Sequence, residues 1–247
     1  MFPVMNRKDY CVIIPTYNNG GTLPSVIEKV LQITPNIMVV NDGSTDETDL
    51  LLERFPEIVK LSYMPNKGKG HALKIGFQQA VKQGFRYAIT LDADGQHFPE
   101  ELPRFLEVIS RHPDAMVVGS RFLEQENMPK KNSFANRFSN FWFYVHTLQK
   151  LPDTQSGYRL YPLVHIKKMH ILTNRYETEL EILVKMAWRF VPVISVPISV
   201  FYAPAGERIS HFKPFHDFFR ISLLNTVLTF IALLYFYPRF LIHKIAK

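Results

Sequence analysis

Two carboxylates stand two positions apart in the run Asp92-Ala93-Asp94-Gly95-Gln96-His97, directly after the apolar segment Tyr87–Leu91. The apolar segment predicts a β-strand, and both side chains can turn toward one hard cation where that strand ends. Oxygen ligands are what Mg2+ and Mn2+ prefer, and a diphosphate would complete the coordination shell. Gln96 could add an oxygen and His97 a nitrogen. The pattern indicates a metal site built from Asp92, Asp94 and Gln96 that neutralises charge on a leaving nucleotide.

Two other interpretations of this run compete with the metal site. An EF-hand calcium loop would need Gly and Glu at the positions of His97 and Pro103, which excludes it. The second is a loop whose acids only cap a helix that starts at Pro99. Taken by itself the run favours that second interpretation, and the segments around it decide against it.

Polar segments also follow the other predicted strands of the first half. Asp42 comes directly after Ile37–Asn41 and is placed to bond a ribose hydroxyl or a base edge. The alternative for Asp42 is a turn former beside Gly43. The segment Asn66–Gly70 precedes a helix, so its amides and the side chains of Lys67 and Lys69 can meet phosphate.

The elements that must position these side chains alternate regularly up to about residue 120. Short apolar runs rich in Val and Ile predict strands, and segments with helical spacing lie between them. This alternation predicts an α/β fold with a parallel sheet, helices on both faces and a ligand site outside the carboxyl ends of the strands. Thr22 and Ser44 stand where helix N-caps are expected. The predicted strands span 10–15, 37–41, 58–63, 86–91 and 115–119, and the helices 23–32, 44–54, 70–83 and 99–111.

The second half of the chain has a different rhythm. An aromatic-rich helix is predicted over 133–149, a strand over 156–161, an amphipathic helix over 177–189 and a strand over 191–202. These elements are expected to complete the same domain, on the side where a second substrate would bind. We therefore predict one catalytic domain over residues 1–213 and a membrane-associated helical tail over 214–247.

The tail contains Ile221–Tyr237, seventeen residues without a charge, which is slightly short of the roughly 20 that span hydrocarbon. Basic residues flank the segment on both sides. Together these features favour a helix that lies in the membrane interface, with a short tilted span as second choice. A buried helix of the soluble domain is the third interpretation. A mildly polar stripe at helical spacing consists of Ser222, Asn225, Thr226 and Thr229.

Composition limits the classes of partner and the compartment. With 47% hydrophobic and 21% charged residues the chain is an ordinary globular one. The net charge of +7 suits nucleic acid, an anionic membrane surface or phosphate-bearing substrates. Nucleic acid ranks last, because no Lys/Arg-rich run, helix-turn-helix or zinc-ligand spacing appears. The single Cys11 excludes an internal disulfide, indicates a reducing compartment and is expected to be buried.

Taken in order, the polar segments resemble those of glycosyltransferase family 2. The matching stretches are 13–18, 40–46, 66–70 and 91–94, and the resemblance extends over roughly residues 10 to 202. It implies the GT-A fold, a UDP- or GDP-linked sugar donor, a Mg2+ or Mn2+ ion and inversion at the anomeric carbon. It also implies that Asp92 contacts the donor ribose and diphosphate, and that Asp94 binds the metal with Gln96. The nucleoside would lie against Pro15, Tyr17, Asn18 and Asp42, although Asn19 stands where relatives often have Glu.

A narrower resemblance is to the polyprenyl-phosphate mannosyl- and glucosyltransferase branch, the group similar to dolichol-phosphate mannose synthase. The segments that carry it are 92–97, 119–122 and 153–159. It implies transfer of one sugar to a lipid phosphate at the cytoplasmic face of a membrane. Arg121, Arg137 and Ser156 would then hold the acceptor phosphate, the arginines through their planar fork.

The acceptor region also bears on the choice of acceptor. A sugar hydroxyl must lose a proton and needs a carboxylate base, whereas a phosphate is already anionic. Many hydroxyl-directed relatives carry a Glu-Asp pair where this chain reads Thr154-Gln155-Ser156-Gly157, although Asp153 could still serve as base. Two alternatives to a lipid-phosphate transferase stay open, namely a family member acting on a lipid or glycan hydroxyl and a scaffold with a degenerate transferase domain.

Three further features have both a functional and a purely structural interpretation. Arg208, in the loop 203–213, could support the diphosphate if that loop closes over the donor. Glu177 and Glu179 could face the sugar or begin a solvated helix. An aromatic stripe is expected to be core, with a lipid groove beside Arg137 as the alternative, and it consists of Phe134, Phe138, Phe141, Trp142, Tyr144 and Val145.

Overall fold

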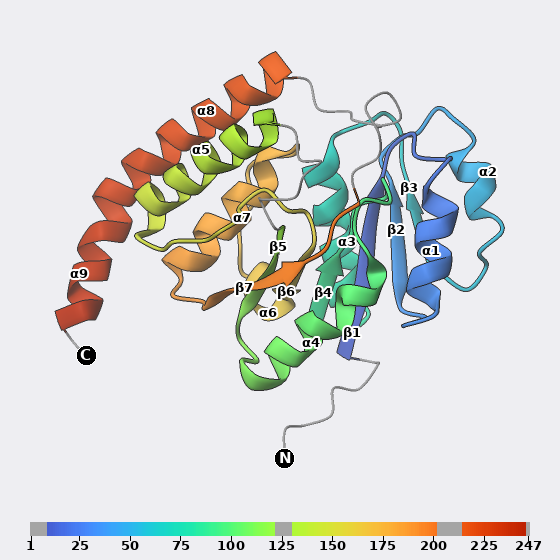
Figure 1. The fold of residues 1–247 in the computed structure, drawn as a ribbon, viewed down its shortest axis with the longest axis horizontal. Helices are drawn as coiled ribbons and strands as arrows, with labels where there is room; N and C mark the ends of the chain where they lie inside the picture. Colours follow the sequence, from blue (N-terminus) through green and yellow to red (C-terminus); the bar gives the residue numbers. More distant parts are fainter. Residues whose placement is uncertain (1–8, 122–129, 202–213, 246–247) are drawn as a thin grey trace.

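A seven-stranded sheet forms the centre of the computed structural model, which describes residues 9–121, 130–201 and 214–245 (Figure 1). The strand order is β3-β2-β1-β4-β6-β5-β7. Only β6 runs antiparallel to its neighbours, β4 and β5, so the sheet is mostly parallel as predicted. The strands are β1 Tyr10–Thr16, β2 Ile37–Asn41, β3 Val59–Ser62, β4 Tyr87–Thr90, β5 Met116–Arg121, β6 Arg159–Pro162 and β7 Val193–Ile198.

Helices cover both faces of this sheet (Figure 1). Alternate residues of β1 point to opposite faces, as the two-residue period of a strand requires. Val12 and Ile14 pack with α1 and α4, whereas Cys11 and Ile13 pack with α3 and α7. Burial of Cys11 is confirmed, since none of its surface is exposed. The helices are α1 Leu23–Leu31, α2 Thr48–Leu52, α3 Lys69–Lys82, α4 Leu102–Arg111 after a 3-10 turn Pro99–Glu101, α5 Lys130–Thr147, α6 Leu163–Ile166 and α7 Glu177–Trp188.

Of the two predicted N-caps, Thr22 is at the expected position and Ser44 is not, and neither side chain makes a capping hydrogen bond. Ser44 lies outside α2, where its hydroxyl accepts from the Asn18 amide at 2.9 Å. Thr22 occupies the N-cap position of α1, yet its hydroxyl donates to the Ala93 carbonyl at 2.6 Å. Both hydroxyls thus join loops that follow different strands, a long-range use that a local capping rule does not capture.

The C-terminal segment forms one long helix, α8 Pro214–Ile231, a π-helical turn Ala232–Phe236 and α9 Tyr237–Ile245. It runs beside α5 along the outer edge of the molecule (Figure 1). Its portion His216–Ile245 has the length and apolar composition needed to cross a membrane, and only 22% of its most apolar window is buried. A helix buried in a soluble core, the third interpretation above, does not match this exposure.

A buried histidine joins this helix to the domain. His146 on α5 has no exposed surface, and its Nε2 lies 3.1 Å from both the Asn225 carbonyl and the Thr229 hydroxyl. Burial lowers the pKa of His146 to about 4, against a smaller opposing effect of the Asn225 carbonyl. Two residues of the predicted polar stripe therefore face the protein, where they pair with this imidazole.

His146 is expected to make stability depend on pH. Its pKa is lower in the folded chain than in the unfolded one, so its contribution is complete above about 6.5 and is lost as pH falls toward about 4. Between pH 7.5 and pH 5 the free energy of unfolding of the wild type should fall by about 1–2 kcal/mol more than that of His146→Gln. Urea unfolding at both pH values measures this difference. His170→Gln, which alters an exposed histidine, should keep the wild-type pH dependence, and equal slopes in wild type and His146→Gln would contradict the assignment.

Candidate active site

Three charged side chains meet where β4 ends. The Lys69 Nζ lies 2.6 Å from Asp92 Oδ1 and 3.1 Å from Glu179 Oε2. Asp92 comes two residues after β4, Lys69 is the first residue of α3 and Glu179 lies in the first turn of α7. Burial opposes the charge of Lys69, but the two carboxylates outweigh it and raise the pKa of this ammonium group. Lys69 in turn keeps the pKa of Asp92 below its usual range, although burial acts to raise it.

Asp94 makes no ion pair with a cation of the described residues, although the charge of Lys69 acts to lower its pKa. Burial and the nearby charge of Asp92 raise the pKa of Asp94 to about 6, and the Gln96 amide, which donates to Asp94 Oδ1 at 3.0 Å, only partly offsets this. A carboxylate that is costly to ionise next to a second one suits a bound cation, which would relieve both effects. The residues present therefore fit a Mg2+ or Mn2+ ion.

A bound cation would need further ligands from a substrate, in addition to those that the protein offers. Among the residues that the structure describes, no three His, Cys, Asp or Glu side chains gather into a metal-binding group. Asp94 would be the main protein ligand, since one oxygen of Asp92, Oδ1, already pairs with Lys69. Diphosphate oxygens would supply other positions, as is usual for Mg2+ held together with phosphates.

Gly157 touches this ion cluster directly. A Cβ atom on Gly157 would lie 2.5 Å from Asp92 Oδ2 and 2.8 Å from Lys69 Nζ, closer than real contacts allow. Gly157→Ala is therefore expected to push both side chains aside and to lower kcat/KM by at least tenfold, with a small loss of stability. Steady-state kinetics and thermal unfolding check this result. Gly21→Ala, where a Cβ would meet nothing within 4 Å, should behave as the wild type, and equal activity of the two variants would contradict the assigned contact.

Asp42 organises the neighbouring loop. Its carboxylate is almost fully buried and accepts from the amides of Lys67 and Gly68, both at 2.8 Å, and from Asn66 Nδ2 at 3.0 Å. Two backbone amides of the segment Asn66–Gly70, which the sequence suggested for phosphate, thus bind Asp42. Asn41, whose Oδ1 accepts from the Ser44 amide at 3.0 Å, is the turn former in this segment. Asp42 thereby fixes the loop that leads directly into Lys69.

The end of β1 is tied to the end of β2. Asn18 adopts a left-handed conformation with φ 53°, and its Oδ1 accepts from the Thr45 amide at 2.7 Å. Pro15 is buried within β1, and Tyr17 is half-buried at its end. The nucleoside-binding residues suggested by the resemblance thus lie on two adjacent strand ends, and Asn18 is one of the residues that join them.

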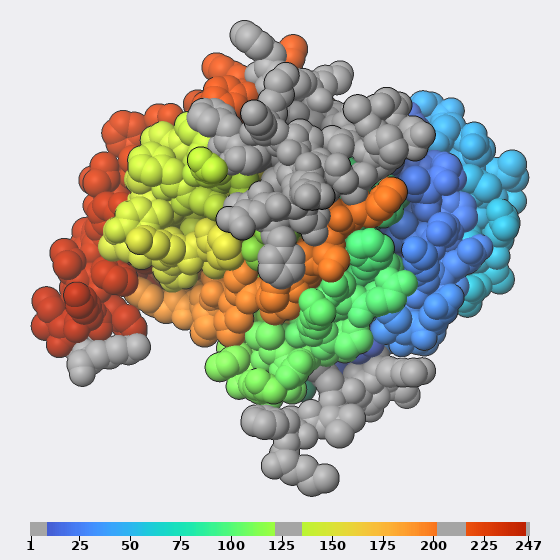
Figure 2. Space-filling model, in the orientation of Figure 1, coloured from blue at the N-terminus to red at the C-terminus, as the bar shows by residue number. Residues whose placement is uncertain are grey.

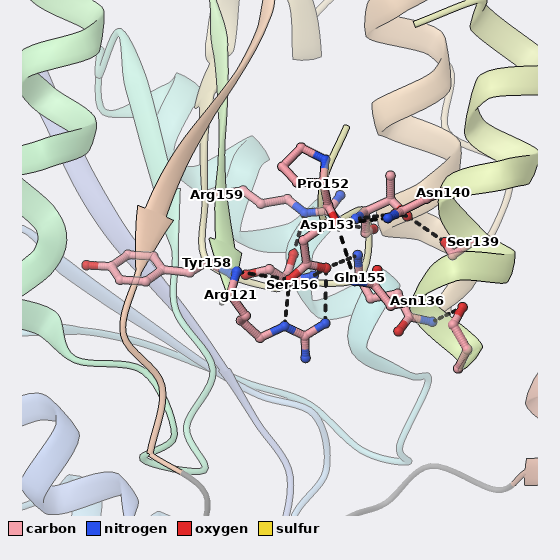
Figure 3. Close-up of polar contacts among 12 residues, drawn as sticks. Arg121, Asn136, Ser139, Asn140, Pro152, Asp153, Gln155, Ser156, Tyr158 and Arg159 are labelled. Atoms are coloured by element: carbon pink, nitrogen blue, oxygen red, sulfur yellow. Dashed lines mark hydrogen bonds and ion pairs between the residues drawn. The ribbon is translucent and has the colours of Figure 1, made fainter. Parts of the chain in front are cut away.

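The loop after α5 is organised by Asp153 (Figure 3). Arg121 Nε and Nη2 donate to Asp153 Oδ2 and Oδ1 at 2.6 and 3.0 Å, in a two-pronged pair. The amide of Gln155 also donates to Asp153 Oδ1 at 2.9 Å. Burial raises the pKa of Asp153, but Arg121 and the amides outweigh it and lower the pKa. A carboxylate so fully bonded is a poor proton acceptor, so Asp153 serves as an anchor of the loop.

Arg159 closes the segment 153–159 that carries the narrower resemblance, but no role was assigned to it from the sequence. It is 1% exposed and donates to three backbone carbonyls, those of Ser156 at 2.6 Å, Thr154 at 2.8 Å and Glu179 at 2.7 Å. Figure 3 shows Arg159 beside the loop after α5. Through the Glu179 carbonyl it also contacts the start of α7 and thereby the ion cluster. An arginine inside an apolar strand is the signal that could have revealed it, because buried charges need dedicated partners.

The remaining predicted residues take varied positions. Ser156 is 1% exposed and its hydroxyl accepts from the Tyr158 amide at 3.3 Å, whereas Arg137 is exposed on α5. Glu177 and Glu179 are both 7% exposed, so the solvated helix start is wrong for them. Arg208 lies outside the described residues. Phe141 and Tyr144 of the aromatic stripe are exposed, which contradicts a core role for these two.

The family model for glycosyl transferase family 2 matches residues 11–167, which include the ion cluster's Lys69 and Asp92 together with Asp94. The chain belongs to glycosyltransferase family 2. A relative named polyprenol monophosphomannose synthase, from Mycolicibacterium smegmatis, is 31% identical over 76% of this chain and 76% of its own length. The UDP-N-acetylglucosamine--dolichyl-phosphate N-acetylglucosaminyltransferase of Methanococcus voltae is 28% identical over 80% of this chain and 88% of its own.

Solved structures show the same fold in more distant proteins. Glucosyl-3-phosphoglycerate synthase from Mycobacterium tuberculosis, solved with Mn2+, UDP and glucosyl-3-phosphoglycerate, superposes with a TM-score of 0.62 at 15% identity. The match covers 92% of this chain and 79% of the synthase. S. aureus TarS 1-349 with UDP gives a TM-score of 0.59 at 18% identity, over 89% and 65% of the two chains. The family 2 chain thus has the GT-A fold predicted from its sequence.

Proposed function

We propose that this family 2 chain is an inverting glycosyltransferase that moves one sugar from a UDP- or GDP-linked donor to a polyprenyl phosphate. The relatives named for transfer to polyprenol or dolichyl phosphate support this acceptor. The observation that carries the proposal is the Lys69–Asp92–Glu179 cluster beside Asp94, whose negative charge is not fully balanced by nearby positive charges or hydrogen bonds. This arrangement suits a metal-bound diphosphate better than any structural purpose, because it places excess negative charge in a partly buried site.

Each donor group has a proposed position. The nucleoside lies against Pro15, Tyr17, Asn18 and Asp42, and Asp92 contacts the ribose and diphosphate. Asp94 and Gln96 hold a Mg2+ or Mn2+ ion, which when bound neutralises the departing nucleoside diphosphate. Lys69 keeps Asp92 ionised and offers a cation at the same edge of the sheet. Arg208 supports the diphosphate from the loop 203–213.

The acceptor side needs no general base. The acceptor phosphate oxygen attacks the anomeric carbon from the face opposite the nucleotide, and the carbon–oxygen bond to the diphosphate breaks with its electron pair on the leaving group. Arg121 and Arg137 attract the phosphate, and Ser156 shapes the loop beneath it. The anchoring role of Asp153 supports this mechanism, because it leaves the acceptor loop without a carboxylate poised to take a proton.

The proposed setting is the cytoplasmic face of a membrane. Residues 1–213 form the transferase domain, and 214–247 form the helical tail that associates with lipid. The long apolar helix and the net charge of +7 support contact with an anionic bilayer surface.

A direct assay separates this function from its alternatives. The purified chain is given Mn2+ with radiolabelled GDP- and UDP-sugars, and either polyprenyl phosphate or the matching polyprenol in detergent. Label in the polyprenyl phosphate supports the proposal, whereas label only in the alcohol assigns the chain to the hydroxyl-directed transferases. If no donor is either hydrolysed or used for transfer, the chain is a non-catalytic scaffold and the proposal is overturned.

A further inference from the structure

The C-terminal helix and α5 both carry exposed apolar side chains, and together these make up a surface here called the outer face. Figure 2 shows the two elements side by side along one edge of the molecule. Large apolar side chains are exposed on both elements. On α5 and directly after it these are Phe141, Tyr144 and Leu148. On the long helix they are Phe218, Phe219, Leu223, Val227, Phe230, Leu233, Leu234, Leu241, Ile242 and Ile245. We propose that the outer face rests in one leaflet of an anionic membrane and that the helix does not cross the bilayer.

The helix is docked on the domain along most of its length. Leu224, Leu228, Ala232 and Phe236 recur at every fourth position and are buried in the same core cluster as α3 and α7. At the helix start Phe218 packs on Phe138, and toward its end His243 stacks on Phe190 with ring centroids 4.2 Å apart. A helix that crossed the bilayer would either break these contacts or draw the α/β domain into hydrocarbon, where its polar surface cannot be solvated.

The polarity of the helix is inverted relative to a surface helix in water. Such a helix normally turns its polar side outward. Here Asn225 and Thr229 face His146, and Asp217 is only 4% exposed, while large apolar side chains predominate on the exposed side. An apolar side turned outward along a helix of this length matches hydrocarbon rather than water.

The charges around the outer face favour lipid over a protein partner. Asp217 is the sole acidic residue between 214 and 247, and it is buried. Arg220, Arg239 and Lys244 are exposed on the helix, and the exposed Lys150 follows α5. Cations bordering an apolar strip are complementary to an anionic lipid surface, where each contributes a favourable electrostatic interaction.

This placement has a consequence that rests on the proposed function. Arg137, Phe141, Tyr144 and Leu148 are spaced by four, three and four residues, so they share one stripe of α5 and its continuation. With the apolar part of that stripe in the leaflet, Arg137 lies at the level of the lipid headgroups. A lipid-linked phosphate can then reach the arginine without leaving the membrane.

Vesicle flotation tests the docking without any assay of transfer. The full chain is mixed with vesicles of phosphatidylcholine and phosphatidylglycerol, and the Leu223→Glu/Leu234→Glu variant is compared with Leu50→Glu/Leu172→Glu. The four leucines are similarly exposed, at 57, 81, 66 and 62%, but the control pair belongs neither to α5 nor to the C-terminal helix. We expect the first variant to lose about a hundredfold or more in partitioning, since a buried leucine contributes roughly tenfold or more to a partition constant. Equal binding of both variants, or a soluble homodimer that does not float, would overturn the proposal.

Depth measurements separate docking from spanning. Single cysteines are introduced as Leu223→Cys, Leu234→Cys and Ile242→Cys and labelled with an environment-sensitive fluorophore, since the native Cys11 is fully buried. Quenching by lipids that carry a quencher at defined depths should place all three labels at one shallow depth. Labels that pass from one leaflet through the midplane to the other would show a span. Thermal unfolding of each variant confirms that it is folded, and the results stand whether or not sugar transfer is observed.

Discussion

Asp94→Ala is expected to lose about a thousandfold or more in sugar transfer while its fold becomes slightly more stable. Activity falls because the proposed metal loses its main protein ligand. Burial and Asp92 raise the pKa of Asp94 to about 6, so its ionised carboxylate destabilises the metal-free fold. Stability therefore rises when this carboxylate is removed. That cost is absent below about pH 4 and complete above pH 6, so the gain should appear at pH 8 and vanish at pH 4.

Two measurements check this prediction together. Single-turnover transfer with Mn2+ reports the activity, and urea unfolding of the metal-free protein at pH 8 and pH 4 reports the stability. Asp114→Ala removes an exposed acid on the far side of the sheet and should change neither quantity. Full activity of Asp94→Ala, with or without metal, would refute the proposed mechanism. A variant that loses both activity and stability would show that Asp94 has a structural role.

Lys69→Met is expected to impair both the fold and the reaction. The change leaves Asp92 and Glu179 as two partly buried carboxylates without their shared cation, which should cost roughly 2–4 kcal/mol of unfolding free energy. The donor diphosphate also loses a cation, so kcat/KM should fall by about a hundredfold or more. Steady-state kinetics and urea unfolding measure the two effects.

A second substitution separates these two consequences. In Lys69→Met/Glu179→Gln one unpaired charge is removed, so part of the stability should return while transfer stays low. A large coupling energy between the two positions is expected, because they share a contact of 3.1 Å. Lys82→Met, at the exposed far end of α3, provides the matched control. If Lys69→Met kept wild-type kcat/KM, the ion cluster would be structural only.

The sheet and the location of the candidate site could be predicted because they follow from local patterns. Short apolar runs that end at Asn41, Leu91 or Gly119 define strands, and helices between them leave few topologies other than a mostly parallel sheet. Parallel strands place their carboxyl ends at one edge, so Asp42, Asp92 and Asp94 could be assigned to that edge without coordinates. The antiparallel β6 was not predictable in this way, since period alone does not set strand direction.

The contacts within the site could not be predicted to the same extent. Lys69 and Glu179 belong to helices far apart in the sequence, and their meeting depends on how α3 and α7 pack against the sheet. The same holds for Arg159, whose three carbonyl partners come from one loop and a helix. Polar pairs of this kind satisfy buried charge wherever packing brings them together, and no local rule encodes the partner.

By itself, then, the amino-acid sequence determined the fold class, the family and the strand ends that carry the acidic residues, because these depend on periodicity and on short motifs. The tertiary structure decided which of those residues pair. It turned Asp42 and Asp153 into anchors of loops, gathered Lys69, Asp92 and Glu179, and rotated the C-terminal helix so that Asn225 faces inward and Leu234 outward. Such choices depend on burial and on partners distant in sequence, which only the packed chain provides.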